Sequence, residues 1–178
     1  IYSLILHTDT NLIMKNFSKD VLSFSMIKDI KDKLHILDNI LKSISDILTI
    51  CIYWYENLTD KIIKVEIEEF LSKNVYKVQL LCEILKTYHI PKSNEIDLFF
   101  QFADQKLKTL KIDIQHGGEI LNGDVNNSIK ILTREINENS LMLIVKLQNK
   151  IPEIMDAELF NGKHNLFSNF SLCYSWQS

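Results

Sequence analysis

Residues that interrupt or loosen a helix are scarce in this chain. It has four glycines and two prolines among 178 residues, and Ala103 and Ala157 are its only alanines. So few glycines and prolines permit long, uninterrupted helices. Isoleucine, lysine and asparagine are abundant instead, a composition typical of an AT-rich genome that concerns source rather than function. The sequence therefore favours an all-α protein with a core of large side chains.

The chain also lacks a concentration of charge of one sign. Its 20 basic and 23 acidic residues are interleaved and leave a net charge of -3. Arg134 is the only arginine, whereas bidentate recognition of phosphate usually uses arginine. Because nucleic acids and anionic membranes are bound through basic patches, we expect no nucleic-acid partner.

Long hydrophobic runs are missing too. The longest one without aromatic residues is 141–145, far short of the roughly 18 residues that a membrane-spanning helix needs. We therefore expect no transmembrane span. Since residues 141–145 are apolar on every side of a helix, we predict that they form its most deeply buried part.

Motifs for catalysis and metal binding are likewise absent. There is no Gly-x-Ser-x-Gly elbow and no glycine-rich loop for phosphate. The nearest approaches to the Glu-x-x-His pattern of dimetal bundles begin at Asp32 and Asp113. Because aspartate is shorter than glutamate, we interpret these residues as solvated side chains rather than metal ligands. We predict that the protein is not an enzyme, with no catalytic, cofactor-binding or metal-binding residue.

Three cysteines, Cys51, Cys82 and Cys173, have no metal-binding spacing. In a secreted protein two of them can form a disulfide, and in a cytosolic one all three stay reduced. Cys51 and Cys82 lie in apolar helical stripes, where a thiol serves as a small hydrophobic side chain.

Heptad spacing is the strongest pattern present. Apolar residues recur at alternating intervals of three and four from Ile27 to Tyr55, which predicts one long central helix over residues 27–55. Further stripes predict a helix over 60–89, ended by Pro91, and one beginning at Ser93 or Asn94. That helix runs to residue 116, where Gly117 and Gly118 end it.

The remaining predicted helices lie toward the chain ends. Asp124 caps a helix over 124–151, and Pro152 either closes it or starts a short helix to Phe160. Asp9 or Thr10 caps a short first helix. One polar residue, Asn74, interrupts the stripe of 60–89; it either fixes the register of packing or is partly exposed.

Together these patterns predict an all-α antiparallel (up-down) bundle of four long helices with short additional N- and C-terminal helices. Residues 1–162 form this single domain, and residues 163–178 form an aromatic tail packed on the bundle. In organisation the chain resembles secreted cytokine-type helical bundles, an architectural likeness without a shared motif.

Four N-glycosylation triplets begin at Asn16, Asn57, Asn126 and Asn169. This is a mild excess over random order for so asparagine-rich a chain, and it favours secretion, with a cytoplasmic location left open.

The leading functional hypothesis is a secreted protein that acts by binding an unidentified protein partner, as an effector or a cytokine-like ligand. Interface anchors are enriched in aromatic residues. The candidate interface residues are Trp54, Tyr55, Phe100, Phe102, Phe170, Tyr174 and Trp176.

Two alternatives stay open. Aromatic residues of a wide-striped bundle can line a cavity for a hydrophobic small molecule, or the bundle can open onto membranes; an apolar cavity of at least ~300 Å³ favours the first. The other alternative is a structural domain of a larger assembly.

Overall fold

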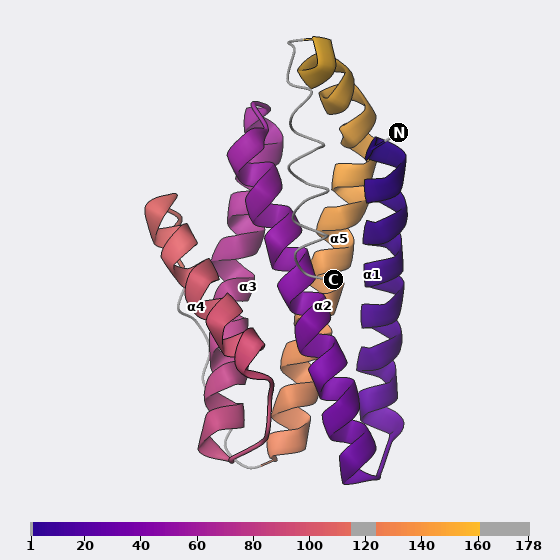
Figure 1. Ribbon diagram of the computed structural model, residues 1–178, viewed down its shortest axis with the longest axis vertical. Helices are drawn as coiled ribbons and strands as arrows, with labels where there is room; N and C mark the ends of the chain where they lie inside the picture. The colour runs from indigo at the N-terminus through magenta and orange to yellow at the C-terminus, as the bar shows by residue number, and fades with distance from the viewer. Residues whose placement is uncertain (1, 115–123, 161–178) are drawn as a thin grey trace.

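Five α-helices form a bundle in the computed structural model (Figure 1). The structure describes the backbone of residues 2–114 and 124–160, and the side chains of residues 10–114 and 124–150. No strand occurs in these described ranges. The helices are α1 (Tyr2–Met26), α2 (Ile30–Asn57), α3 (Lys61–Thr87), α4 (Asn94–Thr109) and α5 (Val125–Phe160).

Four of these helices make up the body of the bundle. α1 packs against α2 and α5, and α3 packs against α5 and α2. Figure 1 shows that α1 is antiparallel to α2 and α5, and that α3 is antiparallel to both of its neighbours. The shortest helix, α4, lies on the outside against α2 and runs in the same direction as α2 and α5. The expected alternation of direction therefore fails between α4 and α5.

The core follows the predicted seam of α2. Its side chains are fully or almost fully buried at Leu37, Leu41, Ile44 and Cys51. The two ends of the seam depart from the prediction, because Ile30, the first residue of the helix, is exposed and Tyr55, near its end, is only half-buried. The heptad pattern thus identifies the helix that packs against all the others.

Side-chain caps begin two of the helices, α4 and α5, where the sequence predicts them. Ser93 Oγ accepts a hydrogen bond from the Glu95 backbone N–H at 3.3 Å. Asp124 Oδ1 accepts one from the Asn126 N–H at 3.0 Å. Each cap satisfies a backbone donor that the first helical turn leaves unpaired, so these two predicted boundaries are confirmed.

The N-terminal helix is long rather than short. α1 spans 25 residues, so Thr10 is a buried residue within the helix and not its cap. Phe17, Val21 and Phe24 form the buried stripe of this helix. Packing against both α2 and α5 stabilises helical turns that local capping signals do not mark.

α4 ends seven residues earlier than its glycine pair predicts. The Lys111 N–H donates to the Lys108 carbonyl at 3.1 Å, and the Ile112 N–H donates to the Leu107 carbonyl at 3.0 Å. Lys111 is left-handed, with φ of 58°. This is a Schellman motif, in which the apolar contact of two buried residues, Ile112 and Leu107, fixes the helix end without glycine.

α5 continues through Pro152 to Phe160 as one helix, and Figure 1 shows its axis bending in the final part. A proline removes one backbone hydrogen bond and commonly kinks a helix. Up to Phe160, where the described residues end, no separate short helix follows Pro152. The predicted tail, 163–178, lies outside the described residues, and the division into a domain and a tail stays a prediction.

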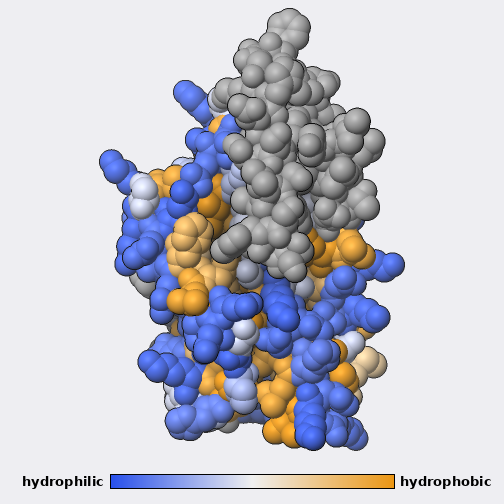
Figure 2. All heavy atoms as spheres, in the orientation of Figure 1, coloured by the Kyte–Doolittle hydropathy of each residue, from blue (hydrophilic) through white to orange (hydrophobic). Residues whose placement is uncertain are grey.

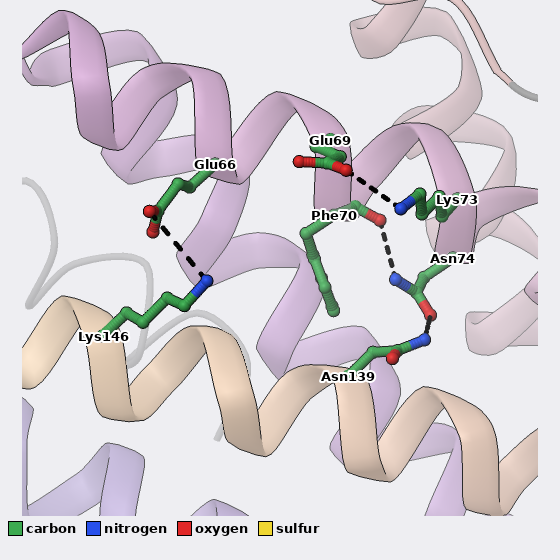
Figure 3. A network of polar contacts seen from close by, with 7 residues as sticks. All are labelled: Glu66, Glu69, Phe70, Lys73, Asn74, Asn139 and Lys146. Carbon is green, nitrogen blue, oxygen red and sulfur yellow. Dashed lines mark hydrogen bonds and ion pairs between the residues drawn. The ribbon is translucent and has the colours of Figure 1, made fainter.

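Polar contacts fix how α3 and α5 align (Figure 3). Asn139 Nδ2 donates to Asn74 Oδ1 at 3.0 Å. On one side of this pair Lys77 Nζ lies 3.3 Å from a Glu135 carboxylate oxygen. On the other side, Glu66 and Lys146 approach to 4.0 Å. These contacts occur in reverse sequence order along the two helices, as an antiparallel pair requires.

Candidate functional site

A cleft of about 280 Å³ lies where α4 stands away from α3. α2 contributes Leu48 to it, and the other lining residues come from α3 and α4. The complete lining is Leu48, Val75, Val78, Gln79, Cys82, Asp97, Phe100, Gln101, Ala103 and Asp104.

The packing of α4 explains why this space is left open. The buried face of α4 carries Phe99, Ala103 and Leu107, and the helix makes most of its contacts with α2 rather than α3. Ala103, one of the chain's two alanines, lines the cleft, and every other apolar residue of α4 has a larger side chain. A methyl group at this point leaves volume that a leucine would fill.

The cleft combines apolar walls with a polar rim. Valine, leucine and phenylalanine side chains form the walls, and Phe100 is held by an edge-to-face contact with Phe99 at 5.7 Å between ring centroids. At the rim, Gln79 Nε2 donates to Asp104 Oδ1 at 3.2 Å and connects α3 to α4. Apolar walls with a few polar groups are typical of small-molecule sites.

Two carboxylates stand at the cleft, each beside a lysine from outside the lining. Asp104 Oδ2 lies 3.2 Å from Lys108 Nζ, and the Lys108 side chain is 75% exposed. Asp97 Oδ1 lies 3.3 Å from Lys92 Nζ, and the Lys92 side chain is only 12% exposed. None of the ten described residues that line the cleft is a lysine, arginine or histidine. The lining residues themselves thus carry only negative charge, and the two lysines that balance it lie just outside the lining.

Cys82 is the one nucleophilic side chain in the cleft lining. Burial raises the pKa of its thiol to about 12; the nearby Lys92 lowers this pKa, and Asp97 raises it. The thiol is thus protonated at neutral pH, whereas the thiolate is the reactive form. Cys51, fully buried, has its thiol pKa raised by desolvation as well, and both cysteines are free. The cleft as built suits noncovalent binding.

Of the four predicted interface aromatics that lie within the described residues, only Phe102 is well exposed. Trp54 is 2% exposed and belongs to the core, so its prediction as a surface anchor is wrong. Tyr55 is half-buried, and Lys64 Nζ lies 4.8 Å from its ring centroid. Phe100 lines the cleft, and Phe102 is 53% exposed on the outer face of α4. The last three candidates, Phe170, Tyr174 and Trp176, lie outside the described residues.

The glycosylation triplets lie in different settings. Asn16 is exposed in the middle of α1, and Asn126 is exposed in the first turn of α5. Asn57 is half-buried at the end of α2, where its Nδ2 donates to the Tyr53 carbonyl at 2.8 Å. Asn169 lies outside the described residues. Use of these triplets stays a prediction.

A second apolar surface, the α5 patch, lies on the exposed side of α5. It consists of Leu141, Met142 and Val145, whose side chains are 46 to 63% exposed. The prediction that residues 141–145 are the most deeply buried part of the helix is therefore wrong. Packing buries only one side of α5, so Leu143 and Ile144 face inward and the three residues of the α5 patch do not.

Other parts of the surface are more conventional. On the face shown in Figure 2, hydrophobic residues occur as separate patches between hydrophilic ones, a normal distribution for folded proteins. No helix in the described part of the chain has a stretch long and apolar enough to span a bilayer. Nor do the described residues gather three His, Cys, Asp or Glu side chains as a metal ion would require.

Comparisons with protein-family models, with curated proteins and with solved structures found no match for this chain. The function is therefore inferred from the all-α bundle and its two surface features, the cleft and the α5 patch.

Proposed function

We propose that this protein acts by noncovalent binding rather than catalysis, and that it holds a small hydrophobic molecule in the cleft between α2, α3 and α4. The observation that carries this proposal is a cleft with apolar walls and a polar rim at the least tightly packed helix. Its volume of about 280 Å³ is slightly below the ~300 Å³ expected of a carrier. Because the cleft is open on one side, part of a ligand can extend into solvent.

The volume sets the size of the ligand. An apolar cavity of about 150 Å³ accommodates benzene, so this cleft accommodates a two-ring molecule of about a dozen nonhydrogen atoms. At roughly 0.3 to 0.6 kcal/mol per atom, such a ligand gains about 4 to 7 kcal/mol. We therefore expect dissociation constants between about 1 mM and 10 µM.

The test uses indole-3-ethanol, an uncharged two-ring alcohol, and isothermal titration calorimetry. Ala103→Leu fills the cleft and is expected to weaken binding by about tenfold or more. Gln105→Leu adds the same side chain to the exposed face of α4 and is expected to leave binding unchanged. Thermal unfolding of both variants verifies that α4 stays folded. Equal binding to all three proteins, or no binding to the wild type, contradicts the proposal.

Protein binding is the second candidate, favoured by the α5 patch. Leu141 and Met142 lie four and three residues before Val145, so the three exposed side chains are neighbours on the surface of one helix. Clustered exposed apolar residues commonly mark interaction surfaces. The partner is then a protein with a complementary apolar surface, and the chain is an effector, a cytokine-like ligand or a domain of a larger assembly.

Site-specific photo-crosslinking tests the second candidate. A crosslinker at position 145 in the full chain is expected to give one discrete protein adduct in material from the natural source. The same crosslinker at Gln105, also exposed, is the matched control. The adduct should disappear when Met142→Glu is added. Adducts of equal yield from both positions, or adducts that survive Met142→Glu, argue against a specific interface.

An extracellular location is part of this proposal, supported by the glycosylation triplets at the exposed Asn16 and Asn126. Native mass spectrometry of protein from its natural source provides the test. A mass raised by glycans supports secretion, and an unmodified mass from a cytosolic fraction contradicts it. The same spectrum detects a retained small molecule.

A further inference from the structure

We propose that the cleft selects a small amphipathic amine, in which a two-ring apolar body carries a protonated amino group. This inference rests on the proposed function, because it names the class of ligand for the same cleft. The lining contains the carboxylates of Asp97 and Asp104 and no cationic side chain. A protonated amine is the complementary charge for this lining, and an anionic ligand is disfavoured.

Asp104 is the carboxylate that binds the amine. Its lysine partner, Lys108, is 75% exposed and lies one helical turn away on α4. Exposed ion pairs of this kind contribute at most about 1 kcal/mol, so a ligand ammonium displaces Lys108 at small cost. Gln79 holds the other carboxylate oxygen at 3.2 Å and keeps the group at the cleft. Asp97 differs because its partner Lys92 is largely buried.

Phe100 orients the apolar body of the ligand. Its ring lies against the cleft, and the edge-to-face contact with Phe99 holds the ring in place. Aromatic rings stack with offset or edge-to-face geometry and attract nearby cations. Val75, Val78 and Leu48 complete an apolar surface deeper in the cleft. A ring system thus lies inward while the amino group stays at the rim beside Asp104.

Three indole compounds of similar size separate charge from shape. Tryptamine is a cation, indole-3-ethanol replaces its ammonium by a hydroxyl, and indole-3-propionate is an anion. We expect tryptamine to bind about tenfold more tightly than indole-3-ethanol at low salt, and indole-3-propionate to bind most weakly. The preference should shrink as salt is raised, because the site is partly open to solvent.

Variants identify the carboxylate. Asp104→Asn is expected to weaken tryptamine binding about tenfold and to change indole-3-ethanol binding less than twofold. Lys108→Gln, which removes the competing ammonium, is expected to strengthen tryptamine binding two- to threefold. Glu69→Gln is the matched control, because Glu69 also pairs with an exposed lysine one turn away, at 2.9 Å, and lies outside the cleft.

The outcomes distinguish this inference from the proposed function. If indole-3-ethanol binds and tryptamine binds no more tightly, the cleft is a carrier site without preference for amines, and the inference is wrong. Unchanged tryptamine affinity in Asp104→Asn overturns the assignment of that carboxylate. If none of the three compounds binds, the inference and the proposed function fail together.

Discussion

Asn74 on α3 and Asn139 on α5 are joined by a hydrogen bond of 3.0 Å, and Asn74 is 1% exposed (Figure 3). The Asn74 Nδ2 donates in addition to the Phe70 carbonyl at 2.8 Å. Both ends of this buried amide are therefore satisfied. A lone asparagine in an apolar seam fixes the register in which two helices pack, at some cost in stability.

The asparagine pair gives a test of coupling between α3 and α5. Asn74→Leu is expected to reduce the free energy of unfolding by about 1 to 3 kcal/mol, because it leaves the partly buried Asn139 amide without its partner. Asn74→Leu with Asn139→Leu should recover at least half of that loss. Urea denaturation of both single variants and the double variant measures the coupling. Strictly additive effects show that the pair does not act as a unit.

Two helix ends carry residues where glycine is the usual choice. His89 and Lys111 have φ of 53° and 58° and follow the ends of α3 and α4. The left-handed conformation costs a residue with a Cβ about 1 to 2 kcal/mol. Glycine avoids this cost, but part of the gain is offset because glycine makes the unfolded chain more flexible. We expect His89→Gly and Lys111→Gly each to stabilise the protein by about 0.5 to 1 kcal/mol.

The control for these variants is Gln105→Gly, within α4, which should destabilise by about 1 kcal/mol. Thermal and urea denaturation measure all three. If Lys111→Gly is as destabilising as the control, the Schellman motif at the end of α4 is not formed.

Asp46 on α2 makes stability depend on pH. Burial raises the pKa of its carboxyl from 3.8 to about 6. Between about pH 4 and pH 6 the folded protein holds a proton that the unfolded chain releases, so the free energy of unfolding falls as pH rises through this window. Asp46→Asn should remove this slope.

The expected gain in Asp46→Asn is up to about 1 kcal/mol at pH 7.5, because solvent contact of the carboxyl reduces the effect, and close to zero at pH 4. Glu83→Gln, at an exposed position on α3, serves as the control and should give the same small change at both pH values. A pH-independent effect of Asp46→Asn indicates that the carboxyl is not buried in the folded protein.

The reactivity of the Cys82 thiol gives a chemical test of the cleft. With Cys173→Ser removing the third cysteine, iodoacetamide should modify Cys82 slowly at pH 7, because burial raises the pKa of its thiol to about 12. The rate should rise about tenfold per pH unit between pH 7 and pH 9. Cys51, fully buried, should stay unmodified.

Indole-3-ethanol at saturating concentration should protect Cys82 from iodoacetamide, with peptide mass spectrometry as the readout. A rate that levels off near pH 9 contradicts a buried thiol. If the ligand does not change the rate at which iodoacetamide modifies Cys82, the ligand binds elsewhere.

Local chemistry made several elements predictable. Ser93 and Asp124 cap helices as expected, Pro91 follows the end of α3, and the α2 seam is buried over most of its length. Each of these features depends on residues near one another in sequence. The sequence allows two roles for Asn74, a register-fixing contact or partial exposure, and its partner on α5 resolves them in favour of register.

The features that the sequence did not predict depend on contacts between residues far apart in the chain. Trp54 is of a residue type that is common among interface anchors, yet its side chain lies in the core. The ends of α1 and α4 depend on what each helix packs against, and so does the exposure of Met142 and Val145.

Helical periodicity and capping are local properties, so the order of the amino acids predicts an all-α protein, the start of most helices and the buried face of the central helix. The position of α4 outside the four-helix body, and the cleft where Ala103 and Asp104 meet Val78 and Gln79, follow from the packing of the folded chain. That arrangement depends on how large side chains fill the space between helices far apart in sequence, which no local pattern specifies.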